Sequence, residues 1–100
     1  MTLRDKQSKF VRMVADLIAW ASANGYELTF GDAWARSGHR FGSLHYLRLA
    51  IDLNLFVNGV FRRDTEAHRP LGEYWESIGG TWGGRFGDGN HYSLEHGGMK

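Results

Sequence analysis

The chain has 100 residues, with 12 basic and 11 acidic side chains and a formal charge of +1. This length predicts one domain, and the near-neutral charge argues against a nucleic-acid binder, which would carry a basic face or stripe. There is no cysteine, so disulfides and thiolate zinc sites are excluded, and any metal must use histidine and carboxylate ligands. No segment reaches the run of about 20 apolar residues that spans a bilayer.

The first predicted element is an amphipathic helix over residues 3–23. Its apolar side chains recur at three- and four-residue spacing, and charged side chains line the other side. Thr2 with Asp5 predicts a helix cap, and the Asn24-Gly25 pair predicts the helix end. The apolar part of this segment has some likeness to a signal peptide, but Asp16 interrupts it, and we expect no cleaved signal.

Two strands are predicted next. Residues 26–30 (YELTF) alternate between polar and apolar, and 31–43 then read as a loop with three glycines. A strand over about 48–57 is favoured because apolar side chains repeat at the strand period, at Leu47, Leu49, Ile51, Leu53 and Leu55. Asn58-Gly59 follows and indicates a tight hairpin.

The remainder of the chain gives weaker signals. Residues 62–70 (RRDTEAHRP) are polar and expected to be exposed, 71–79 (LGEYWESIG) predict a short helix, and 80–98 have no clean period. The predicted fold class is α+β, with the long N-terminal helix packed on a small, mostly antiparallel sheet.

Asp52 is conspicuous because it interrupts an apolar strand. Alternation places the leucines on one side and Ala50, Asp52 and Asn54 on the other. A half-buried carboxylate needs a partner. His45 lies an odd number of residues from Asp52, so the two side chains meet only if His45 sits in a loop or bulge before the strand.

Four residues are candidates for chemistry: His45, Asp52, Asp88 and His91. Two histidines and one carboxylate form a ligand set that zinc accepts, with an open position for water in catalytic sites. Asp88 precedes His91 by three residues in GDGNH, and a carboxylate beside such a water is what a general base needs. Spacing alone also fits a turn aspartate and ordinary histidines, so both interpretations stay open at this point.

Two segments carry a resemblance to a known family. SLHYLRLAIDL, residues 43–53, resembles the Ser-x-His-x(4)-Ala-x-Asp pattern of zinc peptidases that cut cell-wall peptides. These are the VanY-like D-Ala-D-Ala carboxypeptidases and the L-alanyl-D-glutamate endopeptidases of phage endolysins. TWGGRFGDGNHYSL, residues 81–94, resembles the family's closing motif, a Trp-Gly-Gly segment followed by acid-x-x-His. The resemblance runs from about Glu27 to Leu94 and implies a hedgehog/DD-peptidase-like fold with zinc on the open face of the sheet.

The resemblance also implies roles for single residues. It makes His45, Asp52 and His91 the zinc ligands, and Asp88 the catalytic acid that exchanges a proton with water and the leaving amine. Arg36 falls where an arginine commonly holds the substrate or polarises its carbonyl.

This chain departs from the family pattern near these residues. Arg40 is close enough to Arg36 to be the alternative substrate contact, and Arg48 stands where the family usually has glycine. Trp82 and Tyr92 are candidate cleft walls, although core packing explains them as well. His39, His68 and His96 have no place in the pattern and are expected to be solvated or to lie behind the ligands.

The function implied by the resemblance is a zinc-dependent hydrolase of the peptidoglycan stem peptide. We expect an L-alanyl-D-glutamate endopeptidase that acts as a bacteriophage endolysin, with a D-Ala-D-Ala carboxypeptidase as the alternative within the family. We further expect a monomer without nucleic-acid or membrane partners, and one catalytic domain over residues 1–100 with no separate wall-binding domain. Without a signal peptide, the enzyme would stay in the host cytoplasm until lysis and then act on the wall.

Two interpretations lie outside this family. A metal-dependent nuclease would also gather histidine and aspartate around an ion, but the near-neutral charge argues against it. A non-catalytic wall-binding module would hold zinc in a closed four-ligand site, for which His39 offers the fourth ligand.

Overall fold

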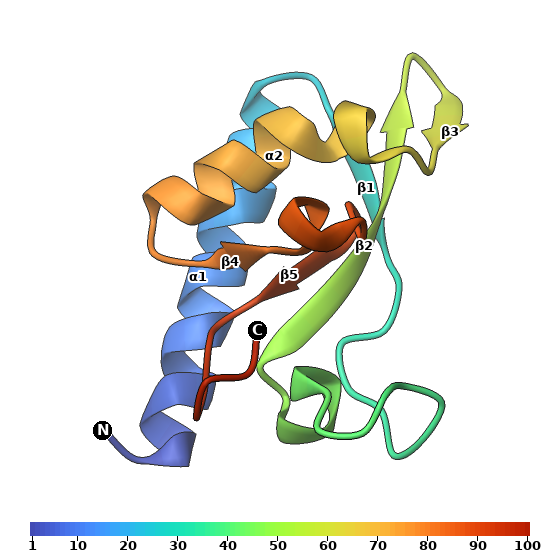
Figure 1. Cartoon of the computed structure of the whole chain (residues 1–100). Coiled ribbons are helices and arrows are strands. Elements are labelled where there is room, and N and C mark those ends of the chain that lie inside the picture. Colours follow the sequence, from blue (N-terminus) through green and yellow to red (C-terminus); the bar gives the residue numbers. More distant parts are fainter.

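The computed structural model describes all 100 residues and shows two α-helices against a small antiparallel sheet (Figure 1). The predicted α+β class is confirmed. The elements in chain order, with η for 3-10 helices, are α1 (Leu3–Ala23), β1 (Glu27–Phe30), η1 (Leu44–Leu47), β2 (Ala50–Val57), β3 (Val60–Arg62), α2 (Thr65–Ser77), β4 (Thr81–Trp82), η2 (Gly83–Phe86) and β5 (His91–Ser93). None of the helices combines the length and apolar character needed to cross a lipid bilayer.

Helix α1 agrees with its prediction at both ends. The Thr2 hydroxyl accepts a hydrogen bond from the Asp5 amide, and the Asp5 carboxylate accepts one from the Thr2 amide, which satisfies two amides that a helix start leaves free. The helix ends at Asn24, and the chain turns at Gly25 with a positive φ of 84°. One face of α1 enters the core through Phe10, Met13, Leu17 and Ala21.

Strand β2 is the centre of the sheet. The strand order is β1-β2-β5-β4, with β3 also paired to β2, and every pairing is antiparallel. The predicted hairpin at Asn58-Gly59 is confirmed, since both residues have positive φ between β2 and β3. The predicted strand start near residue 48 is two residues early, because Arg48 takes a left-handed conformation that ends η1.

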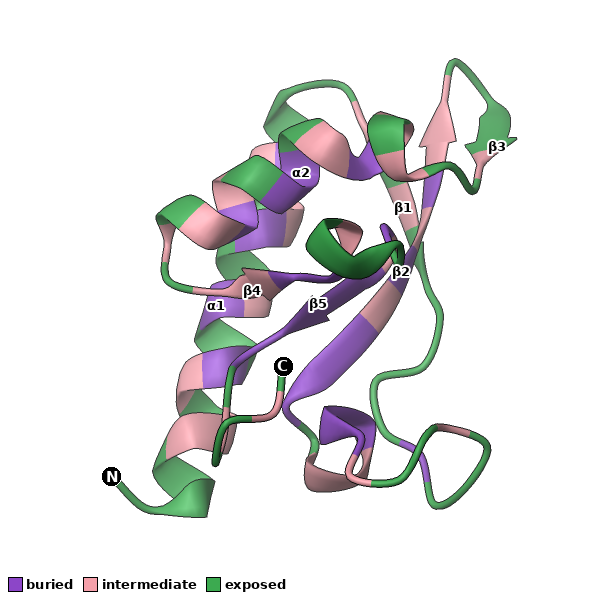
Figure 2. Cartoon of the chain, viewed as in Figure 1, coloured by how far each residue is buried: buried purple, intermediate pink, exposed green.

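The register of β2, β5 and β4 separates a core face from a functional face. Ile51 pairs with Tyr92 and Tyr92 with Trp82, and directly paired residues point to the same side of a sheet. All three are buried in the core that the helices complete, as Figure 2 shows for these strands. Asp52 pairs with His91 one step along, so both side chains point to the opposite face.

Residues 62–70 are exposed or partly exposed except at His68, but the short helix predicted over 71–79 begins earlier than expected. This segment contains the start of α2, which begins at Thr65 after an Asp64 cap and continues through Pro70. His68, expected to be solvated or to lie behind the ligands, is not solvated and is only 1% exposed. The helix start was not predicted because the segment is polar and contains Pro70. Ala67, Leu71 and Trp75 recur every four residues and pack into the core, which supports the helix. The strands β4 and β5 were also missed, since segments of two and three residues are too short to show a period.

Candidate metal centre

His45 reaches the sheet from the short helix η1 rather than from β2. The Ser43 hydroxyl accepts a hydrogen bond from the His45 amide at 3.2 Å and caps η1. Arg48 then turns the chain into β2 with a φ of 57°. This matches the expectation that His45 precedes the strand, and it explains how residues of opposite strand parity come together.

Asp52 lies between two histidines. Its Oδ1 atom is 3.2 Å from His45 Nε2 and 3.4 Å from His91 Nδ1. The histidine side chains are 2% and 8% exposed and that of Asp52 20%, so the three side chains are largely buried. The β2–β5 pairing brings His91 to Asp52, and η1 brings His45.

The two separations around Asp52 Oδ1 match those of a zinc site. Neighbouring ligand atoms in a tetrahedral site with bonds of about 2.0–2.1 Å lie about 3.3–3.4 Å apart, close to the two separations around Asp52 Oδ1. Two imidazoles and one carboxylate are ligands that zinc takes in catalytic sites. The opposite ring nitrogens, His45 Nδ1 and His91 Nε2, are buried without a hydrogen-bond partner in the chain and are not the atoms that contact Asp52.

The pKa of Asp52 is governed by opposing effects. Burial alone would raise the pKa of this carboxyl, but the hydrogen bonds and charges of His45 and His91 outweigh burial and hold the pKa well below its usual range. Asp52 therefore remains ionised at neutral pH.

Asp88 lies beside this cluster without joining it. Its Oδ2 atom is 4.0 Å from His91 Nδ1, and its side chain is 54% exposed. A turn holds it there, because the Asp88 amide donates to the Gly83 carbonyl at 2.9 Å and the His91 amide to the Asp88 carbonyl at 3.1 Å. An exposed carboxylate next to a buried ligand cluster is placed to exchange protons with water or substrate.

A cavity of about 390 Å³ opens over the cluster. Arg40 lines it, and its guanidinium donates to the Lys100 carbonyl at 3.1 Å. Arg36 is exposed and does not line this cavity. The lining residues are Gly38, His39, Arg40, Ser43, His45, Asp52, Phe86, Asp88 and His91.

His39 adds a second donor set that overlaps the first. Ligand atoms of His39, His45 and Asp52 all lie within 4.8 Å of one another. The His39 ring stacks on His45 with centroids 4.0 Å apart, and its Nε2 is 3.0 Å from Asp32 Oδ2. His91 is not part of this second set, and His39 Nε2 is already engaged by Asp32. The sequence analysis did not predict this Asp32–His39 pair.

Trp82 and Tyr92 do not form cleft walls, because both are fully buried. The Tyr92 hydroxyl lies 2.7 Å from His68 Nδ1. Burial lowers the pKa of His68 and raises that of Tyr92, so both stay neutral near pH 7. This pair lies on the core side of β5, and Tyr92 directly follows His91.

An α+β fold with two histidines and one aspartate converging, and a free carboxylate alongside, is the arrangement expected of a metal-dependent hydrolase site. A family model described as D-alanyl-D-alanine carboxypeptidase matches residues 35–94, more than half of the chain, and this range contains His45, Asp52, Asp88 and His91. The chain belongs to this family of peptidoglycan-acting metallopeptidases, whose members are typically zinc-dependent. No curated protein and no solved structure matches the chain.

Proposed function

We propose that this protein is a zinc-dependent L-alanyl-D-glutamate endopeptidase that cleaves the peptidoglycan stem peptide as a phage endolysin. The observation that carries the peptidase assignment is the convergence of His45 and His91 on Asp52, with Asp88 beside them. His45, Asp52 and His91 would hold the zinc. As an endolysin, the protein would act as a monomer on the wall after release from the host cytoplasm.

The residues around the cluster have separate roles in hydrolysis. Bound zinc supplies a Lewis acid that polarises the scissile carbonyl and makes a water more acidic. Asp88 accepts a proton from the attacking water as the C–O bond forms, and it returns a proton to the leaving nitrogen as the C–N bond then breaks. Of the two candidate arginines, Arg40 lines the cavity, and we assign it, rather than Arg36, to the substrate carbonyl.

Room on both sides of Asp88 supports an endopeptidase. A second cavity of about 380 Å³ shares Asp88 with the first, so a peptide can extend past the residue that protonates its leaving nitrogen. The D-Ala-D-Ala carboxypeptidase alternative is favoured by the description of the matching family. That enzyme would need space for only one residue beyond the scissile bond.

Mass spectrometry of purified peptidoglycan fragments, after incubation with zinc-loaded protein, tests the proposal. New fragments that begin at D-glutamate support the endopeptidase, and loss of a terminal D-alanine supports the carboxypeptidase. The Asp88→Asn variant is the control for contaminating activity. An unchanged wall would contradict both activities and favour the wall-binding module.

A further inference from the structure

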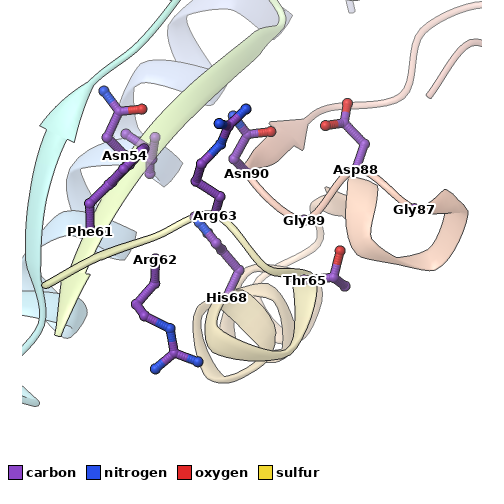
Figure 3. A pocket seen from close by; sticks show the side chains of 11 residues that line it. Asn54, Phe61, Arg62, Arg63, Thr65, His68, Gly87, Asp88, Gly89 and Asn90 are labelled. Atoms are coloured by element: carbon purple, nitrogen blue, oxygen red, sulfur yellow. The ribbon is translucent and has the colours of Figure 1, made fainter.

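The second cavity lies between the β3–α2 connection and the loop that carries Asp88. Its lining residues are Leu53, Asn54, Phe61, Arg62, Arg63, Thr65, His68, Gly87, Asp88, Gly89 and Asn90 (Figure 3). Gly89 holds the loop against the start of α2, because a Cβ atom there would lie 2.6 Å from Thr65 Cα. Asp88 is therefore the junction between this cavity and the metal centre.

Two adjacent arginines line this cavity, and only one of them is paired with a carboxylate. Arg62 makes two hydrogen bonds to the Asp64 carboxylate, at 2.9 and 3.1 Å, and Asp64 also caps α2. Arg63 makes no ion pair or hydrogen bond within the chain. Figure 3 shows Arg63 extending toward Asn90, whereas Arg62 is turned away. Since burial lowers the pKa of His68 and keeps its ring neutral, Arg63 is the uncompensated cation of the cavity.

The chemistry of the reaction indicates which part of the substrate enters here. Asp88 protonates the leaving nitrogen, so the residue that follows the scissile bond lies on the Asp88 side of the metal centre and continues into this cavity. In an L-alanyl-D-glutamate link, the carbon attached to that nitrogen carries a free carboxylate, because the chain continues through the side-chain carboxyl. A terminal D-alanine carries a carboxylate on the same carbon, so both activities of the family present one chemical group.

We propose that Arg63 is a specificity-determining residue that binds the carboxylate on the residue following the scissile bond. The proposal rests on the proposed function and deepens it. A planar guanidinium binds a carboxylate through two parallel charge-assisted hydrogen bonds, and an amide in the same position loses most of that interaction. The enzyme should therefore prefer stem peptides with a free D-glutamate carboxylate over those in which this carboxylate is amidated.

The test compares kcat/KM for the tripeptide L-Ala-γ-D-Glu-L-Lys with that for its D-isoglutamine form, in which the α-carboxylate is an amide. We expect the wild type to prefer the acid about tenfold. Arg63→Met should remove most of this preference by slowing the acid substrate, with less than about twofold change for the amide. Arg62→Met is the matched control and should keep the preference, since its guanidinium is already bound by Asp64. Peptides ending in D-Ala-D-Ala, with a free or amidated terminus, make the same comparison for the carboxypeptidase.

The possible outcomes separate the role of Arg63 from the peptidase assignment. Cleavage with the same acid preference in wild type and Arg63→Met overturns the role of Arg63 and leaves the peptidase assignment intact. Equal loss on both substrates overturns it as well, because a structural defect does not distinguish acid from amide. Calorimetric binding of the same peptides to zinc-loaded Asp88→Asn protein gives a readout without turnover. If the wild type cleaves no peptide and this variant binds none, the proposed function and the role of Arg63 both fail.

Discussion

Gly83→Ala should weaken zinc binding while leaving the fold largely intact. Gly83 is the first residue of η2, and a Cβ atom built there would lie 2.3 Å from the Asp88 carbonyl oxygen and 2.7 Å from His91 Cβ. Ordinary contacts between such atoms are about 3.2–4.0 Å, so Asp88 and His91 must each retreat by roughly 1 Å. The obstacles are a backbone oxygen and the first side-chain atom of a strand residue, rather than ends of flexible side chains.

A shift of this size affects the binding of zinc more than the packing of the core. Zinc–ligand distances hold to about 0.2 Å, so a displaced His91 no longer reaches the position set by His45 and Asp52. We expect the Kd for zinc to rise at least about tenfold, and the overpacking to cost about 1–3 kcal/mol in the free energy of unfolding. Competition with a chromogenic chelator measures the first quantity and urea unfolding of the metal-free protein the second.

The control for this experiment is Gly79→Ala. Gly79 has a φ of 104° with nothing within 4 Å of an added Cβ, so the alanine strains the backbone far from the metal centre. Stability should fall while the Kd for zinc stays unchanged. A folded Gly83→Ala protein that binds zinc as tightly as the wild type would refute the ligand role of His91 or the close approach of η2.

Three further predictions follow from the same geometry. Asp88→Asn should retain a full equivalent of zinc by elemental analysis and lose at least about 10²-fold in kcat; loss of zinc would show that Asp88 is a ligand. His45→Ala and His91→Ala should each lose zinc and lower the Tm in zinc-containing buffer, and a full equivalent of metal in either would contradict the ligand set. Because the pKa of Asp52 is lowered in the fold, the metal-free protein gains stability from this carboxylate above the unfolded pKa of about 3.9 and loses it as pH falls below about 4. Urea unfolding at pH 5 and pH 3 should show a smaller loss for Asp52→Asn, and an equal loss would mean that other carboxyls cause it.

Local patterns in the sequence determined much of this protein. The capping box of Thr2 and Asp5, the alternating apolar residues of β2 and the Asn58-Gly59 turn all act over a few residues. The odd spacing between His45 and Asp52 even required a break before the strand, which η1 supplies. These features could be predicted because neighbouring residues alone decide them.

Tertiary structure decided what depends on distant segments meeting. The pairing of β2 with β5 brings Asp52 next to His91. The sequence did not predict β5, because the strand is too short to show a periodic pattern. The buried place of His68 depends on helix α2 packing against Tyr92. The choice between Arg36 and Arg40, and the unpaired state of Arg63, follow from where loops lie in space. Side-chain burial and charge pairing are properties of the packed chain, and residue spacing along the sequence does not encode them.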